Sequence, residues 1–92
     1  MSEEDRVLHL TLQRVWFDKI KAGRKTEEYR EKKPYWQTRL FRKNGGPKQF
    51  SFIEFRNGYR SNAERMRFRF DGISETEEQF VIKIGERVKV KA

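Results

Sequence analysis

The chain has 92 residues and a net charge of +8, and its charged residues (39%) outnumber its hydrophobic ones (35%). This length fits one domain and excludes a two-domain protein, and the core must depend on large aromatic residues, among them eight Phe and two Trp. The lack of cysteine excludes disulfides and thiolate metal sites, and a single histidine, His9, excludes a multi-histidine metal site.

The sequence carries no signal for a membrane or a secreted protein. No apolar run approaches the ~18 to 20 residues of a membrane-spanning helix. The first five residues, Met-Ser-Glu-Glu-Asp, are acidic and lack the apolar segment of a secretory signal. We therefore expect a cytoplasmic protein without a membrane partner, monomeric by default, with a flexible acidic tail at residues 1–5 and one domain over residues 6–92.

Positive charge is concentrated in the middle of the chain. Residues 14–69 hold seventeen Lys or Arg and six Asp or Glu, whereas residues 1–13 and 70–92 have net charges of −2 and −1. Such a distribution attracts polyanions in a salt-dependent manner, and aromatic residues are interleaved with the cations. RNA or a nucleotide is the expected partner; DNA and an acidic protein are the alternatives.

The first part of the chain predicts a strand, a helix and a second, short strand. Residues 7–12 alternate between leucines and polar residues, which is typical of a half-buried strand. Residues 13–22 predict a helix whose apolar stripe consists of Trp16, Phe17 and Ile20. A glycine at position 23 is typical of the left-handed residue that ends a helix, and residues 26–30 follow as a short strand.

A second helix and a longer strand come next. The Lys-Lys-Pro sequence begins a helix over residues 35–42, with Trp36 and Leu40 on its buried side. The Asn-Gly-Gly-Pro sequence at 44–47 predicts a loop. Residues 49–56 have apolar side chains on both faces, which predicts a central strand.

The last part of the chain predicts two further strands. Residues 65–70 place three arginines on one face, spread over roughly 13 Å, and Met and Phe on the other. This arginine face either spans two phosphate spacings of a nucleic acid or is an ordinary solvated face opposite Glu54 or Glu78. The Asp-Gly pair at 71–72 predicts a turn.

After this turn we expect an acidic connector at residues 74–78 and a closing strand at 80–91. Gly85, within this run, predicts a bulge or a tight hairpin.

The stretch from residue 20 to residue 30 carries the most distinctive pattern. Extended backbone after the glycine puts Thr26, Glu28 and Arg30 on one face. The turn before this strand allows Lys25 to swing toward Glu28 and Arg30. A cation, a carboxylate and a guanidinium gathered in this way can bind an anion or move a proton, although a charged, solvated edge strand has the same residues.

The spacing Gly23-x-Lys25-x-x-Glu28-x-Arg30 resembles the signature Gly-x-Lys-x-x-Glu-x-Arg of the ASCH (activating signal cointegrator homology) domain, a relative of the PUA RNA-binding fold. The order of elements fits this family over nearly the whole chain, including a Phe-Arg-Asn-Gly-Tyr turn at residues 55–59. The resemblance implies a β-barrel with a cleft between barrel and helices, the signature on the cleft wall and the turn near its rim.

The predicted elements lead to the same fold class without the resemblance. Two helices cannot cover so many strands as a flat layer, and a curved sheet with helices at its ends is the economical arrangement. We expect an α+β protein, a small PUA-like open β-barrel of five or six strands with two helices.

The first hypothesis for function is a binding module for RNA or a nucleotide, without metal or cofactor. Lys25 and Arg30 would hold phosphate, and Glu28 would accept hydrogen bonds from a base amine or a ribose hydroxyl. Aromatic rings would stack on exposed bases, worth ~1 to 3 kcal/mol per base. The turn after residue 56 has more donors than a connector needs, which favours a binding loop. The further contacts expected are Tyr35, Trp36, Arg56, Asn57, Tyr59 and Arg60.

The second hypothesis is an RNA-processing hydrolase with Lys25 and Glu28 as catalytic residues. Some ASCH relatives resemble acetylcytidine amidohydrolases and others are ribonucleases. In the amidohydrolase branch a threonine nucleophile stands three residues after the lysine, where this chain has Glu28. Thr26 is a poor substitute, because on an extended strand it points in a different direction from that position. The branch also needs a carboxylate from a later helix, which has no evident counterpart in this chain. Metal-free phosphodiester cleavage is the other route, with Glu28 as base and Lys25 and Arg30 stabilising the phosphate, although nearby cations make a carboxylate a weaker base.

Overall fold

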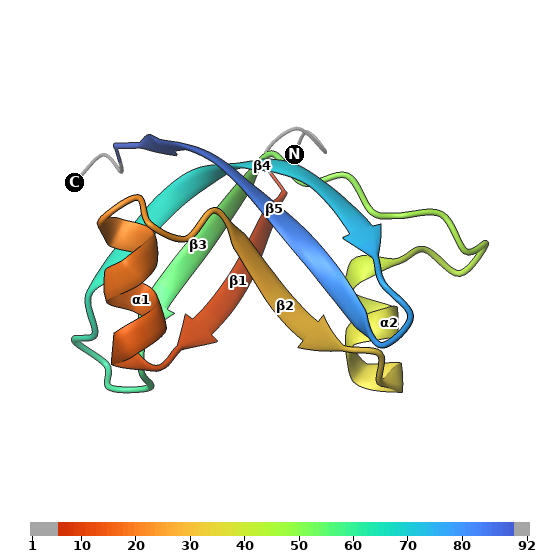
Figure 1. Cartoon of the computed structure of the whole chain (residues 1–92), viewed down its shortest axis with the longest axis horizontal. Helices are drawn as coiled ribbons and strands as arrows, with labels where there is room; N and C mark the ends of the chain where they lie inside the picture. Colours follow the sequence, from red (N-terminus) through yellow and green to blue (C-terminus); the bar gives the residue numbers. More distant parts are fainter. Residues whose placement is uncertain (1–5, 90–92) are drawn as a thin grey trace.

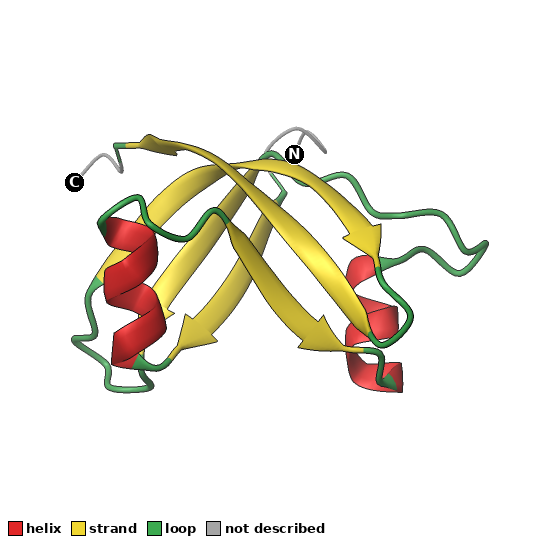
Figure 2. Ribbon diagram, viewed as in Figure 1, coloured by secondary structure: helices red, strands yellow, loops and turns green. Residues whose placement is uncertain are grey.

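The structure, a computed structural model, describes residues 6–89 and has a strongly curved five-stranded sheet with a short helix near each end of its open side (Figures 1 and 2). The elements in chain order are β1 (Val7–Leu12), α1 (Arg14–Lys21), β2 (Glu27–Glu31), α2 (Pro34–Leu40), β3 (Phe52–Asn57), β4 (Arg65–Glu75) and β5 (Gln79–Val88). This half-barrel confirms the expected α+β fold class of a small open barrel with two helices. The predicted tail at residues 1–5 and the end of the predicted last strand, residues 90–91, lie outside the described residues.

The strand order explains where the barrel stays open. The sheet runs β1-β3-β4-β5-β2, with β1 parallel to β3 and all other neighbours antiparallel. Within the described residues, β1 therefore pairs only with β3, and β2 only with β5. The free edges of β1 and β2 border the open side of the half-barrel (Figure 1).

The core fills the concave face of the sheet, as the alternating patterns predict. The leucines of β1 lie beside Ile53 and Phe55 of β3, and all of them are buried. The two helices close the core from the ends. Their buried residues are Phe17 and Ile20 of α1 and Leu40 of α2.

Trp16 corrects the prediction for the first helix. The spacing placed it in the buried stripe, but its exposed fraction is 42%, whereas Phe17 and Ile20 are buried. The helix packs on the Phe17 and Ile20 side, which leaves the indole at the margin of the contact. There it faces Lys25, with the ammonium 5.3 Å from the ring centroid.

The second helix is shorter than predicted, and Arg42 lies outside it. The helix ends at Leu40 because Phe41 adopts extended backbone, pairs with Pro47 and is buried. Its ring lies 5.1 Å from that of Phe80, measured between centroids. The tertiary contact of this aromatic side chain thus ends the helix before the glycines of the loop.

The predicted turn at residues 71–72 is wrong, because β4 continues through it to Glu75. Phe70 pairs with Ile84 and Ile73 with Ile82, so β4 carries one extra residue between these pairs. Gly72 has a φ of 116°, which suits such a bulge. The predicted acidic connector is reduced to residues 76–78.

The bulge predicted at Gly85 is confirmed. Phe68 pairs with Arg87 and Phe70 with Ile84, so here β5 carries the extra residue. A side chain at Gly85 would bring its Cβ to 3.2 Å from the carbonyl oxygen of Arg69. Bulges on both partners increase the local bend and twist of the pair and help to curl the sheet.

The third strand begins later than predicted, at Phe52, and ends at Asn57. The turn that the Asn-Gly pair at residues 57–58 predicts opens a loop over residues 58–64. Gly58 has a φ of 82°, and its N–H donates a hydrogen bond of 3.0 Å to the carbonyl of Leu12. This bond fixes the loop to the end of β1.

The arginines of β4 lie on the outer face with carboxylates beside them. Arg67 donates a 2.8 Å hydrogen bond to Glu54, and Arg65 lies 3.9 Å from the same carboxylate. Arg69 pairs with Glu86 at 3.3 Å. Of the two interpretations of this face, the structure favours the solvated face with acidic partners, and Glu54 rather than Glu78 supplies the charge.

Candidate functional site

The structure brings Lys25, Glu28 and Arg30 together. The ammonium of Lys25 lies 3.5 Å from one carboxylate oxygen of Glu28, and the guanidinium of Arg30 lies 3.5 Å from the other. Glu28 is only 6% exposed and is the one charged residue fully buried among residues 6–89. Burying a carboxylate requires compensation, which the two cations supply.

The local sequence positions each of these side chains. Gly23 has a φ of 79° and turns the chain out of α1, where the N–H of Lys25 donates to the carbonyl of Lys19. Glu28 lies opposite the buried Ile82 of β5 in the sheet register, so its side chain shares the inner face. The predicted face is confirmed for Glu28 and Arg30, and so is the predicted swing of Lys25, whereas Thr26 is exposed and precedes the strand, which begins at Glu27.

The cluster also covers the free edge of β2. The N–H of Tyr29 donates to the carboxylate of Glu28 at 3.1 Å, and Arg30 donates to the carbonyl of Tyr29 at 2.7 Å. Edge backbone groups need partners, and these bonds provide them. Part of the cluster is therefore structural.

A tryptophan flanks each of the two cations. Trp16 of α1 lies 5.3 Å from the ammonium of Lys25, and Trp36 of α2 lies 5.1 Å from the guanidinium of Arg30. Both distances fall within the range of cation–π contacts. The two helices thus contribute one ring each to opposite sides of the charged cluster.

Further aromatic residues extend these contacts. The guanidinium of Arg39 contacts the rings of both Trp36, at 5.8 Å, and Tyr35, at 5.4 Å, and Tyr35 is 61% exposed. On the other side, the ring of Tyr29 lies 4.7 Å from Lys25. The hydroxyl of Tyr29 donates to Glu27 at 2.8 Å; this hydrogen bond is the main cause that raises the pKa of Tyr29, and partial burial and the charges of Glu27 and Glu28 add to it.

A cavity of about 360 Å³ opens beside the cluster, between the edges of β1 and β2. It is lined by Thr11, Leu12, Gln13, Trp16, Lys25, Glu28, Tyr29 and Arg30. Its volume lies in the range of small-molecule sites, ~300 to 1,000 Å³. The cavity can hold one group that carries both negative charge and hydrogen-bond donors.

Several lining residues were not predicted from the sequence. Nothing in the chemistry of residues 11–13 indicated a site. They line the cavity only because the curved sheet brings the edge of β1 close to that of β2. Trp16 had one available signal, its spacing of three from Lys19, whose ammonium lies 4.9 Å from the indole ring. This spacing puts a cation beside a ring on the helix surface.

The turn after β3 contributes less to the cavity than predicted. Arg56 donates hydrogen bonds to the carbonyls of Tyr59 and Arg60, so its guanidinium serves its own turn. It lines a separate cavity of about 240 Å³ on the outer face. Asn57 pairs with Leu12, which lines the main cavity, whereas Tyr59 is 84% exposed.

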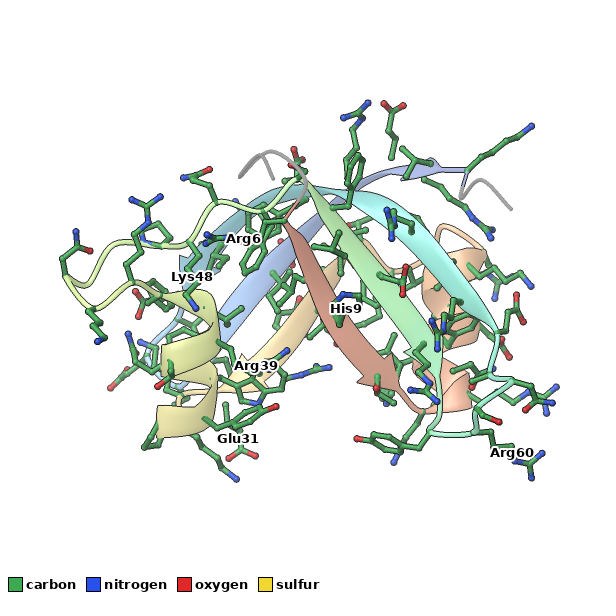
Figure 3. The ribbon with its side chains drawn as sticks, turned by 180° about the vertical axis from the view of Figure 1, so that it is seen from behind. Arg6, His9, Glu31, Arg39, Lys48 and Arg60 are labelled. Atoms are coloured by element: carbon green, nitrogen blue, oxygen red, sulfur yellow. The ribbon has the colours of Figure 1, made fainter. Side chains whose placement is uncertain are left out.

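Arg60 lies at the far side of the molecule from α2 (Figure 3). Of the predicted site residues, the structure thus brings Lys25, Glu28 and Arg30 together with Trp36. Tyr35 joins this group through Arg39, which contacts both of the aromatic rings. It places the side chains of Arg56 and Arg60 elsewhere.

Comparisons with family models and curated proteins add no family or function to these observations. The chain matches no family model and no curated protein. Within residues 6–89, no helix has the length and apolar character that crossing a membrane requires, and no three His, Asp or Glu side chains gather where they could hold a metal ion.

Proposed function

We propose that the cavity between β1 and β2 binds one nucleotide of a single-stranded RNA, the function that the resemblance to ASCH domains implies. The observation that carries the proposal is a buried carboxylate between two cations, beside an open cavity that Trp16 lines, with Trp36 against the second cation. Lys25 and Arg30 hold the phosphate, Glu28 accepts a hydrogen bond from the base or the ribose, and the rings stack on the base.

The distances within the cluster support binding over a purely structural role. Charge-assisted N–H···O bonds close to about 2.7–2.9 Å when both partners are free to optimise them. Arg67 and Glu54 reach 2.8 Å on the outer face, whereas both cations of the cluster remain 3.5 Å from Glu28. Lys25 and Arg30 therefore keep N–H donors for an incoming oxygen.

The hydrolase alternative has weaker support from the same geometry. Glu28 already accepts the N–H of Tyr29 and lies 3.5 Å from each of two cations, so both of its carboxylate oxygens have partners within the protein. A general base needs a carboxylate oxygen within hydrogen-bond reach of the proton that it takes up. We therefore rank RNA cleavage second and make it an outcome of the experiment.

Lys25→Ala and Arg30→Ala are each expected to lower the affinity for a labelled mixed-sequence RNA about tenfold, a typical loss for one charge-assisted contact. Lys83→Ala is the matched control, because Lys83 is exposed on β5 and lies opposite Glu27 rather than in the cavity. Fluorescence anisotropy at several salt concentrations measures the affinity. Each lost phosphate contact should lower the salt slope by about 0.7 for single strands.

Two results would overturn this proposal. Affinity that is the same at low and high salt would exclude phosphate contacts. RNA product that accumulates with the wild type and disappears with Glu28→Gln would make the protein a hydrolase. Acetylcytidine, incubated in parallel, tests amide hydrolysis in the same way.

A further inference from the structure

The segment from residue 32 to residue 53 carries six Lys or Arg and no Asp or Glu. Two of its cations have acidic partners elsewhere, since Lys32 pairs with Glu75 and Lys33 with Glu31. The other four make no ion pair with any of residues 6–89. They are Arg39, Arg42, Lys43 and Lys48, which belong to α2 and the loop that follows it; Figure 3 labels Arg39 and Lys48.

The loop that carries three of these cations has a defined shape. The N–H of Arg42 donates to the carbonyl of Gly46 at 2.7 Å, and the N–H of Lys48 donates to the carbonyl of Leu40 at 2.9 Å. Between these bonds, Phe41 pairs with Pro47. Phe41 is buried against Phe80 and anchors the loop to the core. The backbone positions of Arg42 and Lys48 are therefore set by the fold.

A cavity of about 490 Å³ lies at this loop. Arg42, Lys43 and Lys48 line it together with the amide of Gln37 and the hydroxyl of Thr38. No carboxylate of residues 6–89 lines it. It differs in this respect from the main cavity, which contains Glu28, and from the outer-face cavity that contains Glu54.

The end of α2 does not account for these charges. A helix carboxyl end carries about half a negative charge. Two of the carbonyls there already have backbone donors, since Gln37 accepts from Phe41 and Leu40 from Lys48. The three cationic side chains donate no hydrogen bond to residues 6–89. Their positive potential is left largely uncompensated.

We propose that this cavity binds a backbone phosphate and is a second anchor for the RNA strand whose nucleotide occupies the main cavity. The proposal rests on the proposed function for the identity of the ligand. The contacts of Arg30, Trp36, Arg39 and Tyr35 run along α2 between the two sites. The seven residues of α2 span about 10 Å, so one nucleotide cannot reach both sites. Use of the second anchor must depend on the length of the strand.

The test compares two triple variants, each of which removes three positive charges. The first variant removes the charges of the second cavity through Arg42→Gln, Lys43→Gln and Lys48→Gln. The matched control carries three substitutions at exposed positions outside both cavities, Arg24→Gln, Lys83→Gln and Arg87→Gln. A single nucleotide, which serves as the short RNA because it can fill only one site, and a single-stranded RNA of roughly twenty nucleotides are titrated at several salt concentrations. Thermal unfolding confirms that both variants are folded.

We expect the first triple variant to lose at least about tenfold in affinity for the long RNA and to lower its salt slope by about 0.7, the value for one phosphate contact on a single strand. Its affinity for the short RNA should remain within about twofold, and the control should lose less than about threefold on either RNA. Equal losses in the two triple variants, or no loss in the first, would overturn the second anchor.

The same titrations separate this proposal from the one for the main cavity. If the short RNA binds and requires Lys25, but the first triple variant binds the long RNA as the wild type does, the second anchor is wrong and the main site stands. If the long RNA requires the second cavity while Lys25→Ala has no effect, the main site is wrong and the second stands.

Discussion

The Glu28→Leu variant is expected to lose about 3 kcal/mol of its free energy of unfolding, near the lower end of the range for breaking a buried ion pair. The substitution leaves the mostly buried Lys25 and Arg30 without the carboxylate that lies 3.5 Å from each. It also removes the acceptor of the Tyr29 N–H. Urea unfolding, compared with wild type at the same pH and salt, measures the loss.

Adding Lys25→Met and Arg30→Met to this variant should recover most of the lost stability. A buried ion cluster that is replaced as a whole by apolar side chains of similar volume is often neutral for stability. Binding of a single nucleotide in the main cavity should nevertheless be lost, because no cation of the cluster remains. If the triple variant is as unstable as Glu28→Leu, the protein needs the hydrogen bonds that the cluster makes with the backbone of Tyr29. The charged side chains of the cluster would then have a structural role.

The Phe17→Ala variant is expected to lose about 3–5 kcal/mol of its free energy of unfolding, the usual cost for a buried phenylalanine. Phe17 is 0% exposed and fixes α1 against the sheet, and the residue before it in the helix is the cavity-lining Trp16. Val15→Ala is the matched control on the same helix; Val15 is 51% exposed, and its loss should stay within about 0.5 kcal/mol.

Guanidinium unfolding followed by circular dichroism measures both variants. Similar small losses for the two would mean that α1 is not anchored through Phe17. The wall of the main cavity that α1 forms would then need another explanation.

Features with a local cause could be predicted from the sequence. The alternation in residues 7–12 and the spacing of Phe17 and Ile20 reflect which face is buried, so both elements were found within one residue of their ends. Gly23 ended its helix as its backbone freedom suggests. The shared face of Glu28 and Arg30 follows from the period of a strand, whatever lies opposite.

Features that depend on distant partners could not be predicted. Residues 71–72 have the composition of a turn, and only their pairing with β5 makes them a bulge. The helix end at Leu40 depends on Phe41 meeting Phe80, which is far along the chain.

The candidate site likewise has a part that could be predicted from the sequence and a part that could not. Its cluster lies within one short segment of the sequence, but its second wall is formed by residues 11–13, which meet β2 only through the curvature of the sheet. Trp16 was assigned to the core because the spacing of the apolar residues predicts a stripe along the helix. The spacing does not tell which edge of that stripe the sheet covers. The guanidinium of Arg56 instead donates to two carbonyls of its own loop, those of Tyr59 and Arg60.

The most direct measurement is the fluorescence of the two tryptophans, which are the only ones in the chain and flank the two cations of the cluster. Trp16→Phe and Trp36→Phe each leave one indole to report on its side of the charged cluster. Titration with a short single-stranded RNA should change the emission of both variants, and Lys25→Ala should shift both changes to about tenfold higher RNA concentrations. RNA that binds, as anisotropy shows, while neither indole responds would place the binding site elsewhere and contradict the proposed function.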